Sequence, residues 1–263
     1  MKTNLTILAG AIRAEWIKLR SVRATYLTMF TAVALGIGLG AADTASIARH
    51  WATMNAADRA AFDPVGDSFT GFVYGELAFG VLGVLAISSE YTTGMIRATL
   101  TAVPHRGTVL AAKALALGAV TLVLGELFTF TTFLLGQAIL SGKHLEVSLT
   151  DPDVLRAVAS AGLYLAVVAI VGLGLGTVIR HTPAAIAALF ALVYLAYGAA
   201  RALEPWTYLP SQLLLTNASD VLAQLHPRAA KPRLPSLDLA YLDLALYLLV
   251  TLTLGAWRVT RDA

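Results

Sequence analysis

The segment Val154–Ile179, VLRAVASAGLYLAVVAIVGLGLGTVI, decides the fold of this chain. It is apolar over more than the roughly 20 residues that an α-helix needs to cross the hydrocarbon core of a membrane. Five further segments have the same character and are separated by polar or proline-containing breaks. They are about Thr25–Ala42, Phe69–Ser88, Val109–Leu140, Ala184–Ala202 and Leu239–Trp257. The sequence therefore predicts an all-α integral membrane protein with six transmembrane helices, in a single domain over residues 1–263.

The amino-acid composition favours a membrane protein over a soluble one. Hydrophobic residues make up 57% of the chain and charged residues only 13%, against about 25% charged residues in typical soluble domains. The chain has no cysteine, which excludes disulfides, cysteine-ligated zinc and a thiol nucleophile. Its net charge of +3 comes from basic residues beside the apolar segments, without the basic and aromatic patch of nucleic-acid binders. We therefore expect the lipid bilayer, and no nucleic acid, as a partner.

Basic residues near the spans predict the orientation, because cytoplasmic loops are enriched in Lys and Arg. With a cytoplasmic N-terminus, 11 of the 19 Lys and Arg residues lie on the cytoplasmic side. The patterned segment before the first span carries several of them, usually dominates the orientation, and is too long for a cleaved signal peptide. We expect a plasma-membrane protein with both termini in the cytoplasm, although the basic residues of the outer loop 203–238 argue for the opposite orientation.

An amphipathic helix is predicted over residues 4–20, before the first span. Its apolar residues recur at steps of three and four, which is the spacing of one helix face. They are Leu5, Leu8, Ile12, Trp16 and Leu19. Such a helix lies in the membrane interface, and Trp16 would sit at the depth of the lipid headgroups. The segment either serves only as a positively charged anchor or is a structural helix that touches a cytoplasmic partner.

Glycine pairs spaced by four residues occur in several spans. They are Gly36 and Gly40, Gly71 and Gly75, and Gly172 and Gly176. Small residues at this spacing allow helices to approach closely in lipid. The run of glycines from Gly172 to Gly176 is a poor match to a dinucleotide-binding loop, because its third glycine is misplaced and no strand precedes it. We expect these glycines to serve helix packing.

The segment from Ser88 to Lys113 is cytoplasmic in this orientation and is too short for a domain. Glu90 and Arg97 lie seven residues apart, so a continuous helix would place them on one side. Ile96 and Leu100 would share an apolar side, and Pro104 would stop the helix. These residues are Glu90, Arg97, Ile96, Leu100 and Pro104. A short amphipathic helix between two spans suits docking into a groove on a soluble partner.

Sequence motifs of catalytic sites are missing. The chain has no G-x-x-x-x-G-K-[ST] phosphate loop, so it cannot bind and hydrolyse ATP by that means. It has neither the H-E-x-x-H pattern of zinc hydrolases nor the G-x-S-x-G nucleophile elbow. Its five histidines lie in loops or at span ends and do not cluster in sequence. We therefore expect no catalytic residue, no metal site and no bound cofactor in this chain, and no soluble catalytic domain.

Two carboxylates are predicted deep in the membrane. Glu76 lies about 18 Å from the inner end of its span, and Glu126 about 20 Å from the inner end of the next. These spans follow one another in antiparallel order, so the two carboxylates can reach similar depth. An ionisable group at that depth is costly and often functional. Either Glu76 and Glu126 face a translocation pathway, or they make structural hydrogen bonds between helices.

Two strings of residues resemble a known family. The string Glu90-Tyr91-Thr92-Thr93-Gly94-Met95-Ile96-Arg97, followed by Leu100, Pro104, Arg106 and Lys113, resembles the cytoplasmic loop of type-2 ABC transporter permeases. The opening Glu15-Trp16-Ile17-Lys18-Leu19-Arg20-Ser21-Val22-Arg23 is similar to the start of actinobacterial members. Six spans and the segment Tyr208-Leu209-Pro210-Ser211 before the last of them also fit. The likeness covers essentially the whole chain.

The resemblance implies a mechanism as well as a fold. Two permease chains, identical or related, would pair in the membrane, and each would dock on a separate subunit that binds ATP and Mg. The loop 89–104 would contain the coupling helix that receives the motion of that subunit. Its coupling residues would be Glu90, Tyr91, Gly94, Arg97, Leu100 and Arg106. The helix over residues 4–20 would be the connecting helix, with Glu15, Trp16, Lys18 and Arg20.

The resemblance further implies that Glu204–Leu225 forms short, partly re-entrant helices on the outer side, within the extracytoplasmic loop 203–238. The leading hypothesis is therefore the permease subunit of an ABC exporter, with a path lined by the second and fifth spans. Three alternatives remain: a proton-coupled carrier using Glu76 and Glu126, a membrane enzyme, and a sensing or immunity subunit that does not transport. Neither the substrate nor the choice between homodimer and heterodimer follows from the sequence.

Overall fold

The computed structural model describes residues 2–21, 23–102, 106–225 and 234–261. This described part is helical and contains no strand, and six helices are long and apolar enough to cross a membrane. The predicted fold class is therefore confirmed. The spans are α2 (Arg23–His50), α4 (Phe72–Thr93), α6 (Arg106–Leu140), α7 (Pro152–Ile179), the fifth span α8–η4–α9 (Thr182–Leu203) and α12 (Leu237–Thr260).

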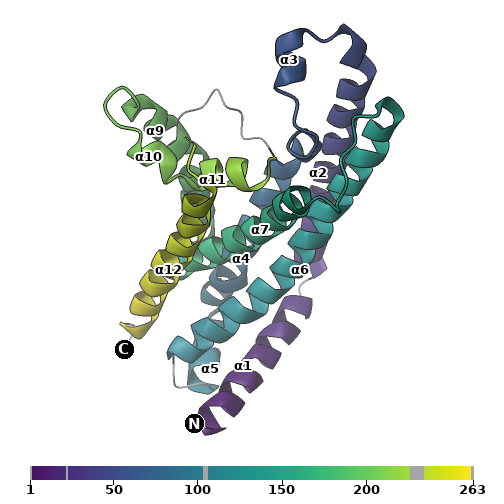
Figure 1. The fold of residues 1–263 in the computed structure, drawn as a ribbon. Helices are drawn as coiled ribbons and strands as arrows, with labels where there is room; N and C mark the ends of the chain where they lie inside the picture. The colour runs from purple at the N-terminus through teal and green to yellow at the C-terminus, as the bar shows by residue number, and fades with distance from the viewer. Residues whose placement is uncertain (1, 22, 103–105, 226–233, 262–263) are drawn as a thin grey trace.

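Helix α7 forms the centre of the bundle, with α4, α6 and α12 packed around it (Figure 1). In the most apolar 18-residue stretch of α7, 72% of the residues are buried. The corresponding share is 17% in the first span and 22% in the fifth. Small residues allow this packing: a Cβ added at Gly172 of α7 would overlap the backbone oxygen of Gly80 in α4. The expectation that the glycine pairs serve close helix contacts is confirmed here. The first and fifth spans keep wide apolar faces uncovered within this single chain.

The first span is longer than the sequence suggested. We predicted its end near Ala42, but α2 continues to His50. Beyond the apolar run, Oδ2 of Asp43 in α2 accepts a hydrogen bond from the Thr70 hydroxyl at 2.8 Å. The chain then returns through three short helices, η1 (Trp51–Thr53), α3 (Ala56–Ala60) and η2 (Asp67–Phe69). Figure 1 shows α3 at one end of the molecule, far from both termini.

The fifth span is not one regular α-helix. We predicted a continuous helix from Ala184 to Ala202. The structure instead has α8 (Thr182–Phe190), one π-helical turn η4 (Ala191–Leu195) and α9 (Ala196–Leu203). A π-turn inserts an extra residue into the helix and frequently lies at functional sites. Here it changes which side chains of the fifth span face the bundle.

Two short helices, α10 (Leu209–Gln212) and α11 (Leu215–Leu222), lie before the last span, in the region predicted to be re-entrant. Arg156 of α7 donates to the backbone oxygen of Leu222 at 3.5 Å and of Gln224 at 3.2 Å. The carboxylate of Asp63 accepts from the backbone N–H of Leu225 at 2.9 Å. These hydrogen bonds add to the packing of Leu215, Ala218 and Leu222 of α11, which are buried in the hydrophobic core. The predicted proline-rich extension lies largely at residues 226–233, outside the described residues.

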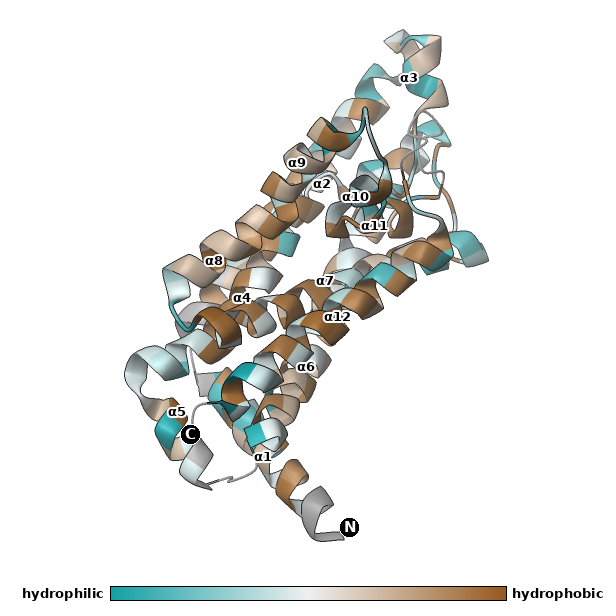
Figure 2. Cartoon of the chain, turned by 90° about the vertical axis from the view of Figure 1, so that its left-hand side faces the viewer, coloured by the Kyte–Doolittle hydropathy of each residue, from teal (hydrophilic) through white to brown (hydrophobic). Residues whose placement is uncertain are grey.

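At the opposite end lie α1 (Lys2–Ser21) and α5 (Met95–Ala102), together with the two ends of the chain (Figure 1). Hydropathy colouring shows the spans largely brown, with teal segments at α3 and near α5 (Figure 2). The helix predicted over residues 4–20 is present as α1. Within the chain, Glu15 is buried and Trp16 is exposed. The position of α1 in the membrane interface stays a prediction.

Candidate functional site

Gly94 separates α4 from α5. It has φ of 71°, and its N–H donates to the backbone oxygen of Tyr91 at 3.3 Å. That left-handed conformation is easy for glycine and ends an α-helix. Glu90 therefore lies in α4 and Arg97 in α5, so the prediction that one helix would carry both on the same side is wrong. Glu90 points into the bundle, whereas Arg97 is exposed.

Glu90 is the meeting point of two lysines from other helices. Its Oε1 accepts from Nζ of Lys18 at 2.9 Å and from Nζ of Lys113 at 2.7 Å. Only 2% of Glu90 is exposed. A carboxylate buried this deeply is stable only when it is paired and hydrogen-bonded. The two lysines come from α1 and α6, so Glu90 joins three helices.

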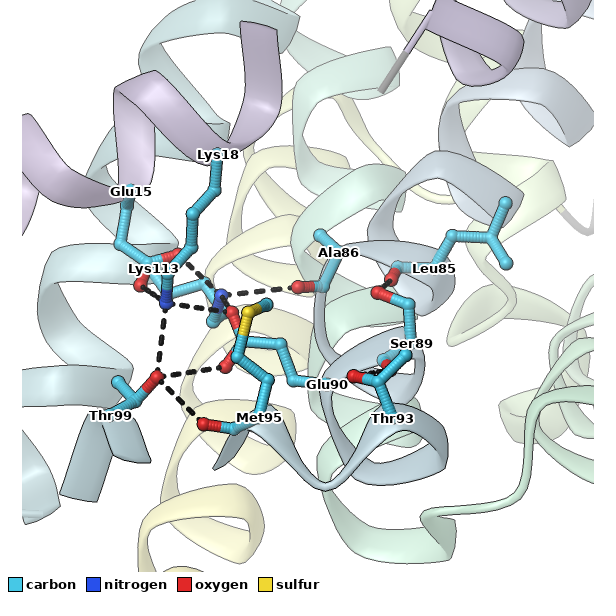
Figure 3. Close-up of polar contacts among 10 residues, drawn as sticks. All are labelled: Glu15, Lys18, Leu85, Ala86, Ser89, Glu90, Thr93, Met95, Thr99 and Lys113. Atoms are coloured by element: carbon cyan, nitrogen blue, oxygen red, sulfur yellow. Dashed lines mark hydrogen bonds and ion pairs between the residues drawn. The ribbon is translucent and has the colours of Figure 1, made fainter. Parts of the chain in front are cut away.

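Glu15 of α1 completes the arrangement. Its Oε1 accepts from Lys18 at 2.7 Å, and its Oε2 accepts from Lys113. Lys113 also donates to the backbone oxygen of Ala86 in α4 at 3.1 Å. Figure 3 shows two carboxylates and two ammonium groups alternating around a common centre. We call the four residues Glu15, Lys18, Glu90 and Lys113 the charged junction.

The charged junction is neutral overall and largely shielded from solvent. Glu15 and Lys113 are each 3% exposed, whereas the Lys18 side chain is 28% exposed. Burial by itself would lower the pKa of the Lys18 ammonium, but hydrogen bonds and charges of Glu15 and Glu90 outweigh it and raise that pKa above the usual value. Each ion thus has two partners of opposite charge. Removing one ion leaves the others incompletely paired, which costs far more than the pairing contributes.

Thr99 connects α5 to the charged junction. Its hydroxyl accepts from Lys18 at 3.2 Å and lies 3.5 Å from Oε2 of Glu90. Beside it, a cavity of about 290 Å³ lies between α1, α5 and α6, lined in part by Ala14, Ala98 and Ala112. Thr99 therefore links the short helix to α1 and α4. Ile96 of α5 also packs against the hydrophobic core.

The remaining predicted coupling residues take separate positions. The guanidinium of Arg180, after α7, lies 5.1 Å from the ring centre of Tyr91. Arg106 donates to the backbone oxygen of Val259 near the end of α12, at 3.0 Å. Both therefore attach α4 and α6 to neighbouring spans. The side chain of Leu100 lies outside what the structure describes, and so does Pro104.

On α1, only two of the four predicted residues enter the charged junction. Trp16 is exposed, and the guanidinium of Arg20 lies 6.0 Å from the centre of its ring. Glu15 and Lys18 face inward instead. The hydrophobic periodicity of α1 missed this, because its packed stripe is centred on a charged residue.

Sequence reasoning also missed the roles of Lys113 and Thr99. Lys113 was noticed only as part of the family-like string, and Thr99 was not singled out. One signal pointed to Lys113: a lone lysine in a long apolar helix needs a partner. Its partners, in α1 and α4, are far away in the sequence and could not be named from it.

Glu76 occupies a different setting, in the middle of the bundle. The hydroxyl of Tyr164 in α7 donates to its Oε1, and the hydroxyl of Tyr194 lies 3.4 Å from its Oε2. Tyr194 belongs to the π-turn η4. Glu76 thus links α4, α7 and the fifth span through neutral donors. This is the interhelical hydrogen bond that was one of the two predicted roles; the pathway role stays a prediction.

Glu126 of α6 lies against α7, beside Gly162. A Cβ added at Gly162 would lie 2.6 Å from its carboxyl carbon, and its Oε2 has no hydrogen-bond partner among the described residues. Asp243 of α12, which sequence reasoning overlooked, is 1% exposed and has an unpartnered Oδ2 within the same described part. An aspartate inside the last apolar run was the available signal. Glu76, Glu126 and Asp243 are named the core carboxylates below.

Comparison with known proteins agrees with this architecture. No curated protein matches the sequence. The sequence model of a family described as ABC-2 family transporter protein matches residues 11–198. The match covers more than half of the 263 residues and includes the whole charged junction, four spans and most of the fifth. Members of this family are membrane transport subunits, and the ATPase lies on a separate subunit. This chain belongs to the ABC-2 family of transporter proteins.

Proposed function

We propose that the chain is the transmembrane permease subunit of an ABC exporter. It moves a substrate out across the plasma membrane, and a separate ATP-binding subunit supplies the energy by hydrolysing ATP. Two such chains, identical or related, form the transport unit. The observation that carries the proposal is the charged junction, because it ties an exposed short helix to two spans and to α1.

The proposed transmission begins at α5. Its exposed side offers Arg97 to a docking partner, and its inner side holds Thr99 against the charged junction. A push on α5 reaches α1 and α4 through Lys18 and Glu90. Lys113 carries it on to α6. Because buried ion pairs resist separation, α1, α4 and α6 move as one unit.

The far part of α4 then connects this motion to the core. Glu76 lies on the same helix and contacts Tyr164 and Tyr194. A shift of α4 strains or releases these contacts at the π-turn of the fifth span. In this proposal the end with α1, α5 and both termini faces the cytoplasm. The uncovered faces of α4 and of the fifth span border the path between two permease chains.

A pull-down coupled to an ATPase assay tests the proposal. The tagged full chain is extracted from native membranes in mild detergent, and the recovered proteins are identified by mass spectrometry. A soluble subunit with a phosphate loop should follow the chain. Arg97→Ala should reduce its recovery and the ATPase activity, since Arg97 is exposed on α5.

The matched control is Arg59→Ala, which removes an exposed arginine from α3 at the opposite end of the molecule. It should leave recovery and ATPase activity unchanged. Absence of any ATP-binding subunit, under conditions that keep other such complexes intact, would overturn the proposal. Equal losses in both variants would show that α5 is not the docking element.

A proton-coupled carrier is the second candidate, favoured by the burial of Glu76 between two tyrosine hydroxyls. Both Glu76 and Glu126 lie against α7, near Tyr164 and Gly162. In that mechanism, purified chain in vesicles would move protons without ATP, and Glu76→Gln would stop the flux. Flux that depends strictly on ATP would exclude this candidate.

A further inference from the structure

Four arginines from three helices meet at the last turn of α12. Arg258 and Arg261 belong to this turn, whereas Arg106 begins α6 and Arg180 follows α7. Arg106 donates to the backbone oxygen of Val259 at 3.0 Å, and Arg180 donates to that of Arg258 at 3.3 Å. They bond to carbonyl groups that a helix leaves without partners at its C-terminus. We call the four arginines the arginine cluster.

Most hydrogen-bond donors at the end of α12 are available to a ligand. Each guanidinium group has five N–H donors. Arg258 and Arg261 are exposed, and neither side chain makes a hydrogen bond or ion pair with another described residue. In the sequence, the four positive charges of the arginine cluster stand against the single negative charge of Asp262. The ligand that fits this surface is therefore an anion.

An exposed apolar stripe on α12 leads to the arginine cluster. Leu246, Val250, Leu254 and Trp257 recur at steps of three and four, and each is 43–50% exposed. Arg261 follows four residues after Trp257, so it lies on the same helix face. Figure 2 shows this part of α12 largely brown. The stripe is about 16 Å long, which is about half of a hydrocarbon core of ~30 Å.

The position of the stripe favours lipid over a protein partner. On its other sides α12 packs against α7, α6 and α11. The proposed transport path borders α4 and the fifth span, and the proposed docking element is α5, so neither role uses the exposed side of α12. The stripe therefore lies against the acyl chains of one leaflet. The arginine cluster, at its end, lies at the depth of the lipid headgroups.

Trp257 and Arg261 are arranged as residues of a membrane surface are. Tryptophan is enriched at the boundary between the acyl chains and the headgroups. The guanidinium of Arg261 lies 4.1 Å from the centre of the Trp257 ring. Stacking uses the flat face of a guanidinium and leaves the N–H groups at its edge free to bond. The ring thus holds Arg261 beside the apolar stripe, where it can bind the headgroup of a lipid.

We propose that the arginine cluster binds the phosphate of an anionic phospholipid in the leaflet that borders it. Arg258 and Arg261 contact the headgroup, and an acyl chain lies along Val250 and Leu254. Guanidinium groups match the oxygens of a phosphate and bind them in pairs. A lipid with a net negative charge is preferred over a zwitterionic one, because the positive charges of the cluster repel a choline group.

Native mass spectrometry tests the preference. The full chain, with any subunit that copurifies, is titrated in detergent with phosphatidylglycerol or with phosphatidylcholine of the same acyl chains. The wild-type chain should bind phosphatidylglycerol more tightly. The double variant Arg258→Gln/Arg261→Gln should weaken that binding about thirtyfold, a difference of ~2 kcal/mol, because each basic residue near a membrane surface contributes ~1 kcal/mol toward an anionic lipid.

The matched control is Arg59→Gln/Arg201→Gln, which removes the same charge. Both arginines are exposed and lie over aromatic rings, Arg59 at 5.8 Å from Trp51 and Arg201 at 5.5 Å from Tyr197. They belong to α3 and α9, at the other end of the molecule (Figure 1). Binding of phosphatidylglycerol should stay at the wild-type level. An equal loss in both double variants would overturn the site, and so would equal affinities of the wild-type chain for the two lipids.

Photocross-linking locates the lipid. Phosphatidylglycerol with a diazirine on its acyl chain should label the part of α12 from residue 246 to residue 261. An excess of glycerol phosphate, which has no acyl chain, should not displace it; displacement would show a site for free phosphate and overturn the lipid. Loss of an associated ATP-binding subunit from the variant, with unchanged lipid binding, would assign the arginines to that subunit.

Thermal unfolding without added lipid checks the folding of each variant. The three chains should unfold at the same temperature, because Arg106 and Arg180 still bond to the end of α12. If the double variant at α12 does not fold, Arg258→Gln alone replaces it and should weaken the binding of phosphatidylglycerol about fivefold. Unchanged binding in a folded variant would overturn the proposal.

Discussion

The charged junction and the core carboxylates solve the same physical problem in opposite ways. Both bury carboxylates in a chain that spans a membrane. In the junction, Glu15 and Glu90 each bind two lysines from different helices. In the core, Glu76 binds neutral tyrosine hydroxyls, and Glu126 keeps an oxygen without a partner in the described part of the chain.

The difference shows how strongly each set of polar contacts holds its helices together. Full ion pairs hold α1, α4 and α6 together, because separating buried charges is costly. Hydrogen bonds between a carboxylate and neutral hydroxyls are weaker than such ion pairs, so the polar contacts of Glu76 hold α4, α7 and the fifth span together less strongly. Close backbone packing, as between Gly80 and Gly172, joins α4 to α7 instead.

The largest effect should come from breaking the charged junction. Lys113→Ala leaves Glu15 and Glu90 with one cation between them, so the free energy of unfolding should fall by ~3–5 kcal/mol. Thermal unfolding of the detergent-solubilised chain measures this. Lys143→Ala, an exposed lysine beyond the other end of α6, is the control and should have almost no effect. If the two variants melt alike, the junction is not a structural unit.

The next largest effect concerns the core. Tyr164→Phe removes the donor to Glu76 and should lower the free energy of unfolding by about 1–3 kcal/mol, the cost of an unsatisfied buried group. Tyr164 has no exposed surface, whereas Tyr241, whose hydroxyl contacts Ser160, is half-buried and provides a control. Tyr241→Phe should cost less. If Tyr164→Phe lowered the free energy of unfolding as much as Lys113→Ala does, the charged junction and the core carboxylates would not differ in strength.

A smaller effect is expected at the link to α5. Gly94→Ala forces an alanine into the left-handed conformation, at ~1–2 kcal/mol, although its Cβ would meet no atom within 4 Å. ATPase activity stimulated by the permease should fall. Gly107→Ala is the control, because Gly107 has equal space but lies in the regular helix α6. Unchanged stimulation in Gly94→Ala would show that the turn does not set the position of α5.

The smallest effect should come from Glu126→Gln. The substitution keeps the shape of the side chain, and the carboxylate has an oxygen without a partner among the described residues. The free energy of unfolding should change by less than about 1 kcal/mol. Transport measured in vesicles separates the two predicted roles of Glu126. Loss of transport at unchanged stability indicates the pathway, and unchanged transport indicates a structural residue.

Several features followed from local sequence. The apolar run of α7 predicted a span, and the pattern over residues 4–20 predicted α1. Two features did not follow. The helix α2 continues past Ala42, where Asp43 pairs with Thr70, and the fifth span contains a π-turn that its uniform apolar sequence conceals. The contact of Asp43 with Thr70 and that of Tyr194 in the π-turn with Glu76 join segments that are distant in sequence.

The candidate site shows the same division. Gly94, Arg97 and Glu90 were recognisable because they lie within one short string. Their arrangement in space was not predictable, because the turn at Gly94 places Glu90 inside the bundle and Arg97 on the surface. Lys113 and Thr99 gained a role only through partners on other helices.

By itself, the sequence determined that six apolar helices cross a membrane and that no phosphate loop or cysteine chemistry belongs to the chain. Hydrophobic length and motif content are local properties, so they can be read along the chain. Only the tertiary structure decided that four charges from α1, α4 and α6 meet, that Glu76 faces two tyrosines, and that a cavity of about 310 Å³ lies beside the junction. Charge pairing and cavity shape depend on which helices become neighbours, and that is settled by packing around α7.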